Sequence, residues 1–260
     1  MDCVIDFQNA VFVADGFPVI AGVDMRVMGG EVIHLRGANG AGKTSLLRAL
    51  VGLIQIKSGR AIVLGHDLAD DRFSVRKDVG LLGHRTFLYD DLTVLDNLRF
   101  VQKIARQPKT SLERSLDKVH ITSRLLSTRV SQLSTGQRKK TALAALLIRD
   151  YKMWLLDEPH AGLDESGRIL VDQLILDFQS TKGTVIIASH ELDRAMSIST
   201  RSMVISGGSI PAGVTRDEAK IVLAAPVDEV DCRYDILTAD TDSYPLSSNK
   251  SDRGGSVDVA

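Results

Sequence analysis

The chain has few cysteines and no long apolar run, and both absences narrow its class. Of its 260 residues only Cys3 and Cys232 are cysteines, and they lie at opposite ends of the sequence. Without a signal peptide ahead of them, we expect free thiols in a reducing cytosol and no disulfide framework. The longest apolar stretches, such as residues 142–148, fall far short of the roughly 20 residues of a membrane-spanning helix. We therefore expect a soluble protein that serves a membrane, if it does so, from the side.

The chain also lacks a strong net charge and internal repeats. Its formal net charge is −1 and 25% of its residues are charged, so its overall charge does not favour nucleic acid or an acidic membrane surface. Hydrophobic residues make up 44% of the sequence, which is enough to bury the core of one large domain or a two-lobed one. We expect a folded globular protein with no nucleic-acid partner.

Apolar runs alternate with helical patterns through most of the chain. Partial period-2 alternation in residues 4–28 and a buried-strand pattern in residues 29–37 predict strands. Further strands are predicted at residues 61–64 and 79–82 and in the runs MWLLD, TVIIA and SMVIS. Residues 93–149 are more charged and have helical patterns, broken at Pro108. Together these patterns predict an α/β fold in which helices pack on both faces of a parallel sheet and a helical lobe is inserted.

The loop GANGAGKT, residues 37–44, is a phosphate-binding motif of the form GxxxxGK[ST]. Its glycines let backbone N–H groups turn toward phosphate oxygens, and the helix that follows adds its positive end. Lys43 is expected to bridge the β- and γ-phosphates, and the Thr44 hydroxyl is expected to hold Mg²⁺. We therefore expect ATP and Mg²⁺ at this loop, with the nucleotide bound by Gly37, Asn39, Gly40, Ala41, Gly42, Lys43, Thr44 and Ser45.

Polar residues end two later strands. Asp157 follows a short apolar run and would hold Mg²⁺ through water, while Glu158 is placed to accept a proton from the attacking water as general base. His190 ends TVIIASH at the same sheet edge and would hydrogen-bond the γ-phosphate. The plainer interpretations are an acidic strand end that caps a turn and a histidine with a structural role. The upstream phosphate loop favours the catalytic interpretation of all three.

The segment LSTGQ, residues 133–137, is consistent with two roles. Ser134 and Gln137 fit the S-x-x-Q capping box at the start of the helix QRKKTALAALL. A serine-capped helix N-terminus is also a ready site for an anion, although its own phosphate loop cannot be assumed to reach it. The two roles are compatible.

Together these motifs resemble the ATPase subunit of ATP-binding cassette (ABC) transporters, over roughly residues 4–208. GANGAGKT is similar to the Walker A motif, LSTGQ to the signature, WLLDE to Walker B, AGLD at residues 161–164 to the D-loop, and Ser189-His190 to the switch histidine. The resemblance implies a P-loop NTPase fold of ABC type, with a mostly parallel core sheet, an N-terminal antiparallel β subdomain and an inserted helical lobe. It also implies a head-to-tail dimer with a second copy of the chain, in which Ser134 and Gly136 face the γ-phosphate held by the other copy's Lys43.

The resemblance further implies integral membrane transporter subunits as partners, and a peripheral location on the cytoplasmic face of the cell membrane. Gln137 and Asp164 complete the nucleotide contacts that it implies. A short helix of the membrane subunit would dock near residues 84–97, where Phe87, Leu88 and Tyr89 form an apolar cluster. Packing at the junction between the lobes is the alternative role of that cluster.

The expected boundaries are an ATPase domain over residues 1–210, with its helical lobe at about 86–150, and a C-terminal extension over 211–225. Residues 226–260 are rich in Ser, Asp and Gly, which predicts a disordered tail.

Two positions depart from the family pattern. His84 stands where the family usually has a Gln that contacts Mg²⁺ and the attacking water. It is a catalytic candidate, although an imidazole replaces an amide oxygen on Mg²⁺ poorly and a simple turn residue is the alternative. Ala14 stands where an aromatic ring normally stacks on adenine. Phe12 or Phe17 are possible substitutes, although core packing is the commoner fate of a Phe in such strands. With LSTGQRKK and WLLDEP, these departures resemble the haem-exporter ATPase of cytochrome c maturation systems (the CcmA type).

Other classes share part of this pattern. An ATPase of a drug or polysaccharide exporter, and a soluble ABC ATPase of the iron–sulfur assembly type, would use the same chemistry. DNA-repair and chromosome-structure ATPases insert long coiled coils, whereas no sustained heptads occur between Thr44 and Leu133. A P-loop kinase would lack LSTGQ and would need a lid over its substrate.

Overall fold

The computed structural model describes residues 2–83 and 85–209. The strands are β1 (Cys3–Ala14), β2 (Phe17–Met28), β3 (Val32–Arg36), β4 (Gln55–Val63), β5 (His66–Asp67), β6 (Val79–Leu82), β7 (Met153–Asp157), β8 (Thr184–Ala188) and β9 (Arg201–Val204). The α-helices are α1 (Lys43–Leu50), α2 (Val94–Ile104), α3 (Lys109–Lys118), α4 (Ser123–Leu126), α5 (Thr135–Leu147), α6 (Glu165–Ser180) and α7 (Leu192–Ile198). Short 3₁₀ turns occur at Ser74–Lys77 and Val130–Gln132.

These strands form two sheets. The N-terminal sheet has the order β2-β1-β4-β5 and its pairings are antiparallel. The other sheet has the order β6-β7-β8-β3-β9 and is parallel throughout. The predicted fold class, a mostly parallel core sheet with an N-terminal antiparallel part and an inserted helical lobe, is confirmed.

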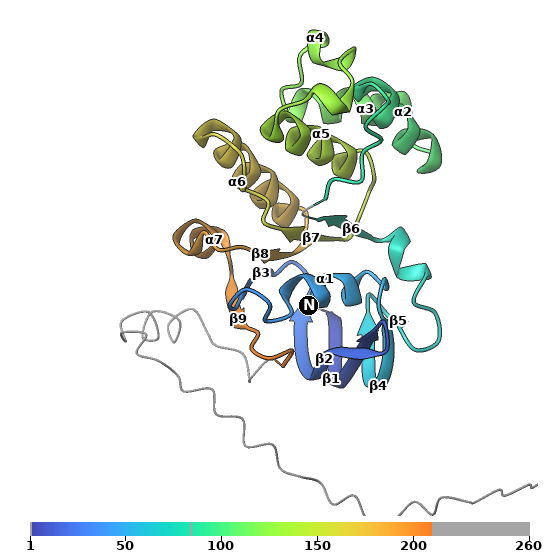
Figure 1. Cartoon of the computed structure of the whole chain (residues 1–260), viewed down its shortest axis with the longest axis vertical. Coiled ribbons are helices and arrows are strands. Elements are labelled where there is room, and N and C mark those ends of the chain that lie inside the picture. The colour runs from blue at the N-terminus through green and yellow to red at the C-terminus, as the bar shows by residue number, and fades with distance from the viewer. Residues whose placement is uncertain (1, 84, 210–260) are drawn as a thin grey trace, which may run out of the picture. The chain divides into compact units, whose positions relative to one another are not determined.

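The parallel sheet is buried on both faces, which explains why its strands are continuous apolar runs. In β7 the side chains alternate between two cores: Met153 and Leu155 belong to one cluster, and Trp154 and Leu156 to the other. The first cluster includes residues of the antiparallel sheet and α1, and the second includes residues of α2, α3, α5 and α6. The sheet therefore separates the two cores, and α1 lies between the two sheets (Figure 1).

The helical lobe consists of α2 to α5, which gather on one side of the parallel sheet (Figure 1). The sequence predicted helices in this region and the strand at Val79–Leu82. The strand expected at residues 61–64 is the second half of β4, which begins at Gln55. The sequence patterns predicted no specific helix at α6 or α7, although both helices carry polar residues that lie next to the candidate site. The expected C-terminal extension at 211–225 and tail at 226–260 lie outside the described residues.

Helix α6 is attached to the sheet by an aromatic pair at its C-terminal end. Phe178 stacks on Trp154 of β7 with the ring centroids 4.0 Å apart and the planes 4° from parallel. Trp154 is only 4% exposed. Because α6 starts directly after the loop that follows β7, this contact fixes the helix whose first turns border the site.

We expect Phe178→Leu to lower the free energy of unfolding by about 1 kcal/mol, because it removes the aromatic stack but keeps most of the apolar volume. Urea denaturation followed by circular dichroism measures this change. Phe17→Leu is the control, since Phe17 is 74% exposed and its replacement should change stability by less than about 0.5 kcal/mol. Equal effects of the two variants would contradict a specific role for the stack.

Candidate functional site

The phosphate loop and the ends of β7 and β8 surround one cavity of about 300 Å³, lined by Ala38, Asn39, Gly40, Gly42, Lys43, Thr44, Ser45, Asp157, Glu158 and His190. The loop joins β3 to α1, and Gly42 at the start of α1 has φ 105°. A Cβ at Gly42 would approach Ile205 and Ile20 side-chain atoms within 3.3 Å. The left-handed backbone and this tight packing both require glycine there. Of the expected loop residues, Gly37 and Ala41 do not line the cavity, and Ala41 packs on the core.

Inside the cavity, the Lys43 ammonium contacts backbone carbonyl oxygens of the phosphate loop, and the Thr44 hydroxyl contacts Asp157, the other expected Mg²⁺ ligand. The Lys43 ammonium donates to the carbonyl oxygens of Gly37 at 2.6 Å and Ala38 at 3.0 Å. Thr44 Oγ1 donates to Asp157 Oδ2 at 2.8 Å. Asp157 is 5% exposed, so the hydroxyl and carboxylate form a pair of hard oxygen ligands at the cavity floor, as Mg²⁺ prefers.

Glu158 is held in an unusual backbone conformation at the end of β7. Its φ is 49°, a left-handed value that few non-glycine residues adopt. Its N–H donates to the Ala188 carbonyl at 2.8 Å, which ties the turn after β7 to the end of β8. Its carboxylate accepts from the His190 N–H at 3.3 Å, and His190 Nε2 lies 3.5 Å from Oε1. The structure therefore brings the candidate base and the candidate switch histidine together.

His34 of β3 contacts the turn that carries His190 through the backbone of Ser189. His34 is fully buried, and its Nε2 lies 3.2 Å from the Ser189 carbonyl oxygen, to which it must donate since a carbonyl only accepts. Burial is the main cause that lowers the pKa of His34, with Arg36 acting in the same direction and the Ser189 bond against it. His34 is therefore a neutral donor near neutral pH.

The LSTGQ segment and the D-loop line a second cavity of about 440 Å³, with Ser134, Thr135, Gly136, Gln137, Lys140, Gly162, Leu163 and Asp164 around it. The capping box is present: Ser134 Oγ accepts from the Gln137 N–H at 3.2 Å, and Gln137 Oε1 accepts from the Ser134 N–H at 3.0 Å. Asp164 caps α6 by accepting from the Gly167 N–H at 2.9 Å, the main cause that lowers its pKa. This cavity and the phosphate-loop cavity share no lining residue.

Lys139 is a site residue that the sequence did not single out. Its ammonium donates to the Glu158 carbonyl oxygen at 2.9 Å, and the side chain is 5% exposed. Burial lowers its pKa, opposed by the charges of Asp157 and Glu158. A signal was available in the helical period, because Lys139 shares a face of α5 with the apolar positions three, four and seven residues later.

The proposed substitutes at the adenine position differ in exposure. Phe12 is fully buried and its ring packs against Phe7 at 5.4 Å, so the suggestion that it replaces the stacking aromatic is wrong. Phe17 is 74% exposed and pairs with Ala14 across the β1–β2 hairpin. His84, the candidate in the Gln position, lies outside the described residues.

The cavity around the phosphate loop fits a nucleotide phosphate with Mg²⁺. The loop glycines leave its backbone accessible, Lys43 supplies positive charge, and the Thr44–Asp157 pair supplies oxygen ligands. Among residues 2–83 and 85–209, no group of three or more His, Cys, Asp or Glu could hold a metal ion. A divalent cation here would therefore complete its shell with phosphate oxygens and water.

Comparison with known proteins agrees with this geometry. The family model described as "ABC transporter" matches residues 20–161. The chain is 31% identical over 190 residues to the cytochrome c biogenesis ATP-binding export protein CcmA of Vibrio cholerae, covering 72% of this chain and 91% of the relative. It is 34% identical over 213 residues to the sulfate/thiosulfate import ATP-binding protein CysA 1 of Agrobacterium fabrum, covering 78% of this chain and 61% of that protein. The chain thus spans only about three fifths of the sulfate import relative.

Solved structures show the same fold. A dimeric ATP-binding cassette in a post-hydrolysis state, bound to ADP and phosphate, superposes with a TM-score of 0.74 at 20% identity over 82% of this chain and 98% of that one. The chain belongs to the ABC transporter family of ATP-binding domains, and it is an ATPase of that class. Across the part of the chain that the structure describes, no helix has the length and apolar character to cross a membrane.

The buried state of His34 predicts how stability depends on pH. Its pKa is lowered from 6.5, so below about pH 6.5 the unfolded chain binds a proton there that the folded chain does not. The pKa of His160 is also lowered, mainly by burial, and acts in the same direction. We expect the free energy of unfolding to fall as pH drops from 6.5 toward the folded-state pKa values, measured as the urea midpoint at pH 7.5 and 5.5.

His34→Gln should make this pH dependence shallower, because the amide keeps a neutral donor for the Ser189 carbonyl. His120→Gln is the matched control, since His120 is exposed and should leave the slope unchanged. A slope in His34→Gln equal to that of the native chain would show that His34 does not cause it.

Proposed function

We propose that two copies of this chain close around two ATP molecules, each held between the phosphate loop of one copy and the LSTGQ segment of the other. The observation that carries the proposal is the division of the nucleotide-binding residues between two cavities. The phosphate-loop cavity has a cation, metal ligands and a candidate base, but no residue of the signature. The other cavity has a capped helix N-terminus and the D-loop, but no lysine of the phosphate loop. A helix N-terminus attracts an anion, and a second copy would supply one.

The residues have distinct roles in this proposal. Lys43 holds the β- and γ-phosphates, and Thr44 with Asp157 holds Mg²⁺, which when bound neutralises the phosphate charge that develops during hydrolysis. Glu158 accepts the proton of the attacking water, because its carboxylate borders the cavity and is fixed by the turn after β8. His190 donates to the γ-phosphate and orients Glu158 across 3.5 Å. Ser134, Gly136, Gln137 and Asp164 serve the nucleotide of the partner copy.

We expect Glu158→Gln to lower kcat for ATP hydrolysis by about 10²- to 10⁴-fold, because the amide cannot accept the proton. ATP binding should persist, since Lys43 and Thr44 are unchanged. Trapped ATP should then hold two copies together, visible as a shift to a dimer by gel filtration with ATP but not with ADP. A variant that stays monomeric with ATP would contradict the sandwich.

Ser134→Arg tests whether the LSTGQ cavity serves the nucleotide of the partner copy or that of its own phosphate loop. An arginine at the cap should abolish hydrolysis, because it obstructs the partner's γ-phosphate, while fluorescent ATP analogues still bind the monomer. Loss of binding by the monomer would instead mean that LSTGQ serves its own phosphate loop. Ser134→Ala is the comparison variant: it removes the hydroxyl without adding bulk, should cost the helix about 1 kcal/mol of capping, and should lower hydrolysis less than Ser134→Arg does.

We further propose that the dimer drives a membrane partner, on the cytoplasmic face of the cell membrane, in haem export or delivery for cytochrome c maturation. The support is the similarity to CcmA proteins over nearly their full length together with the departures at Ala14 and His84. A sulfate importer relative has a comparable identity, so an ATPase of another transporter is the second candidate. Selectivity for the transported compound would reside in the membrane subunits.

The docking surface proposed for that partner borders a cavity of about 270 Å³ lined by residues that include Leu47, Leu81 and Phe87. Phe87 is 72% exposed, which supports docking, whereas its neighbour Leu88 packs against the core of the helical lobe, as the lobe-junction alternative expects. Tyr89, 54% exposed, packs edge-on against Phe100 of α2 at 5.2 Å. An exposed apolar cluster of this kind is typical of an interaction site.

We expect Phe87→Asp to reduce cosedimentation of this chain with membranes that contain its transporter subunits by about tenfold, which corresponds to about 1.4 kcal/mol of lost association. Basal ATPase activity in the absence of membranes is measured in parallel and reports whether the site is intact. Cosedimentation unchanged by Phe87→Asp would overturn this docking surface. Absence of the native chain from the pellet would favour an ABC ATPase that works without a transporter.

A further inference from the structure

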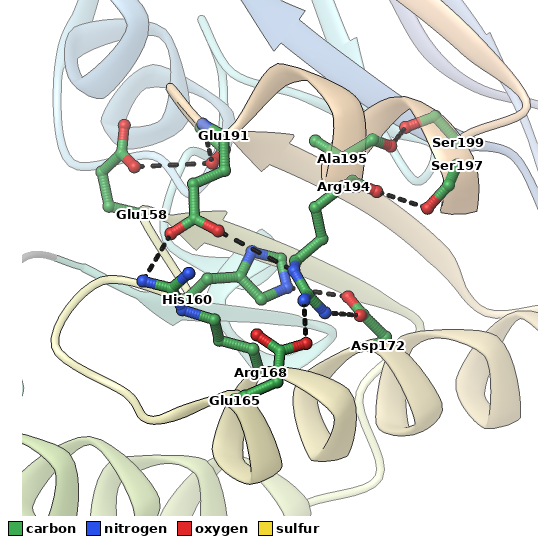
Figure 2. A network of polar contacts seen from close by, with 11 residues as sticks. Glu158, His160, Glu165, Arg168, Asp172, Glu191, Arg194, Ala195, Ser197 and Ser199 are labelled. Carbon is green, nitrogen blue, oxygen red and sulfur yellow. Dashed lines mark hydrogen bonds and ion pairs between the residues drawn. The ribbon is translucent and has the colours of Figure 1, made fainter.

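A network of polar contacts that includes one buried histidine connects the loop after β7 with α7, the helix after β8, apart from the Glu158–His190 contact (Figure 2). His160, two residues after Glu158, is 1% exposed, and its Nε2 lies 2.9 Å from Asp172 Oδ1 on α6. Arg194, four residues after His190, donates to the other oxygen, Oδ2, of the same carboxylate. One oxygen of Asp172 thus accepts from the loop after β7, and the other accepts from α7.

The ion pairs around Arg194 reinforce this arrangement. Its guanidinium also contacts Glu165 at the start of α6, and its Nε lies 3.8 Å from Glu191. The other oxygen of Glu191 lies 3.4 Å from Arg168. Figure 2 shows these side chains converging from α6, α7 and the loop between β7 and α6. A planar guanidinium with several carboxylate partners has a fixed orientation, so α7 cannot rotate without breaking several contacts.

His160 is suited to hold this position without carrying charge. Burial is the largest influence on its pKa and lowers it, against the opposing effect of Asp172, so the ring donates its Nε2 proton as a neutral imidazole. Within the described residues, its Nδ1 is buried without a hydrogen-bond partner. The ring therefore has a single polar contact, and that contact is Asp172.

We propose that His160 and Arg194, through Asp172, are positioning residues that set the distance between Glu158 and His190 for ATP hydrolysis. The inference rests on the roles proposed above for Glu158 and His190. His160 is two residues after Glu158, and Arg194 in the first turn of α7 is four residues after His190, so a shift of either residue would displace the candidate catalytic residue that precedes it. Displacement of a catalytic group by about 1 Å can cost up to about 10²-fold in rate. None of the three residues contacts the phosphate loop.

We expect His160→Ala to lower kcat about tenfold with the KM for ATP unchanged. His160→Gln should restore kcat to within about twofold, because the Gln side chain places an N–H donor close to the position of His Nε2. Asp172→Leu removes both contacts at similar volume, so it should lower kcat at least as much. Because it leaves the buried His160 N–H unpaired, it should also lower the melting temperature, and kcat is therefore measured at a temperature where the variant is folded. The double variant His160→Ala/Arg194→Gln should lose less than the product of the two single losses, because both residues act through one carboxylate.

Phe178→Leu is the matched control, since it weakens the same helix at its other end. It should lower the melting temperature and leave kcat unchanged at a temperature where the protein is folded. Native kcat in both His160→Ala and Asp172→Leu, or equal kcat losses in His160→Ala and His160→Gln, would overturn the proposal. Glu158→Gln is measured alongside. Native kcat in Glu158→Gln would contradict the proposed role of Glu158. A lowered kcat in Glu158→Gln with native kcat in the network variants would contradict the positioning inference alone.

Discussion

The conformation of Glu158 is the constraint on which the site depends. A non-glycine residue at φ 49° costs of order 1 kcal/mol or more relative to the usual regions, and three contacts compensate for it. The N–H bonds to Ala188 at 2.8 Å, the carbonyl accepts from Lys139 at 2.9 Å, and the carboxylate accepts from the His190 N–H at 3.3 Å. The left-handed turn directs the carboxylate into the phosphate-loop cavity while the chain continues toward the D-loop. An extended residue would carry the strand onward instead.

Lys139 of α5 links the helical lobe to Glu158 through a hydrogen bond to its carbonyl oxygen. It is an almost fully buried lysine, and burial of a cation is costly unless it is paired. Its hydrogen bond to the Glu158 carbonyl and the nearby charges of Asp157 and Glu158 offset that cost. Because Lys139 is two residues after Gln137 on α5, the helix that presents LSTGQ is fastened to the turn that presents the Glu158 carboxylate. A rotation of the lobe would therefore strain Glu158 directly.

The sequence was sufficient for those features that depend on short-range pattern. The phosphate loop, the apolar strands and the capping box at Ser134 have local signatures, and the structure has them where the pattern predicts. The Phe12 alternative failed because local pattern does not say which face of β1 meets the core. The network of His160, Asp172 and Arg194 joins three segments, and no spacing rule relates a histidine in one loop to a carboxylate on the next helix. The helical period could have pointed to Lys139, but the sequence does not show which group pairs with a lysine on an apolar helix face. The fold shows that this group is Glu158.

The D-loop shows how the two cavities of one chain are connected. It follows Glu158 and His160 directly and ends at Asp164, which caps α6, so the short segment 158–164 borders both cavities. Gly162, at φ 77°, would place a Cβ 2.7 Å from Thr135 Cγ2, and a Cβ on Gly136 would lie 3.2 Å from the Gly162 carbonyl oxygen. Close approach of the D-loop to the signature helix therefore requires glycine at Gly162 and leaves little room for a side chain at Gly136. His160, in the middle of this segment, is held to α6 by its hydrogen bond to Asp172. The hydrogen-bonded carboxylate of Asp172 thus anchors the middle of the segment that links the phosphate-loop cavity to the LSTGQ cavity.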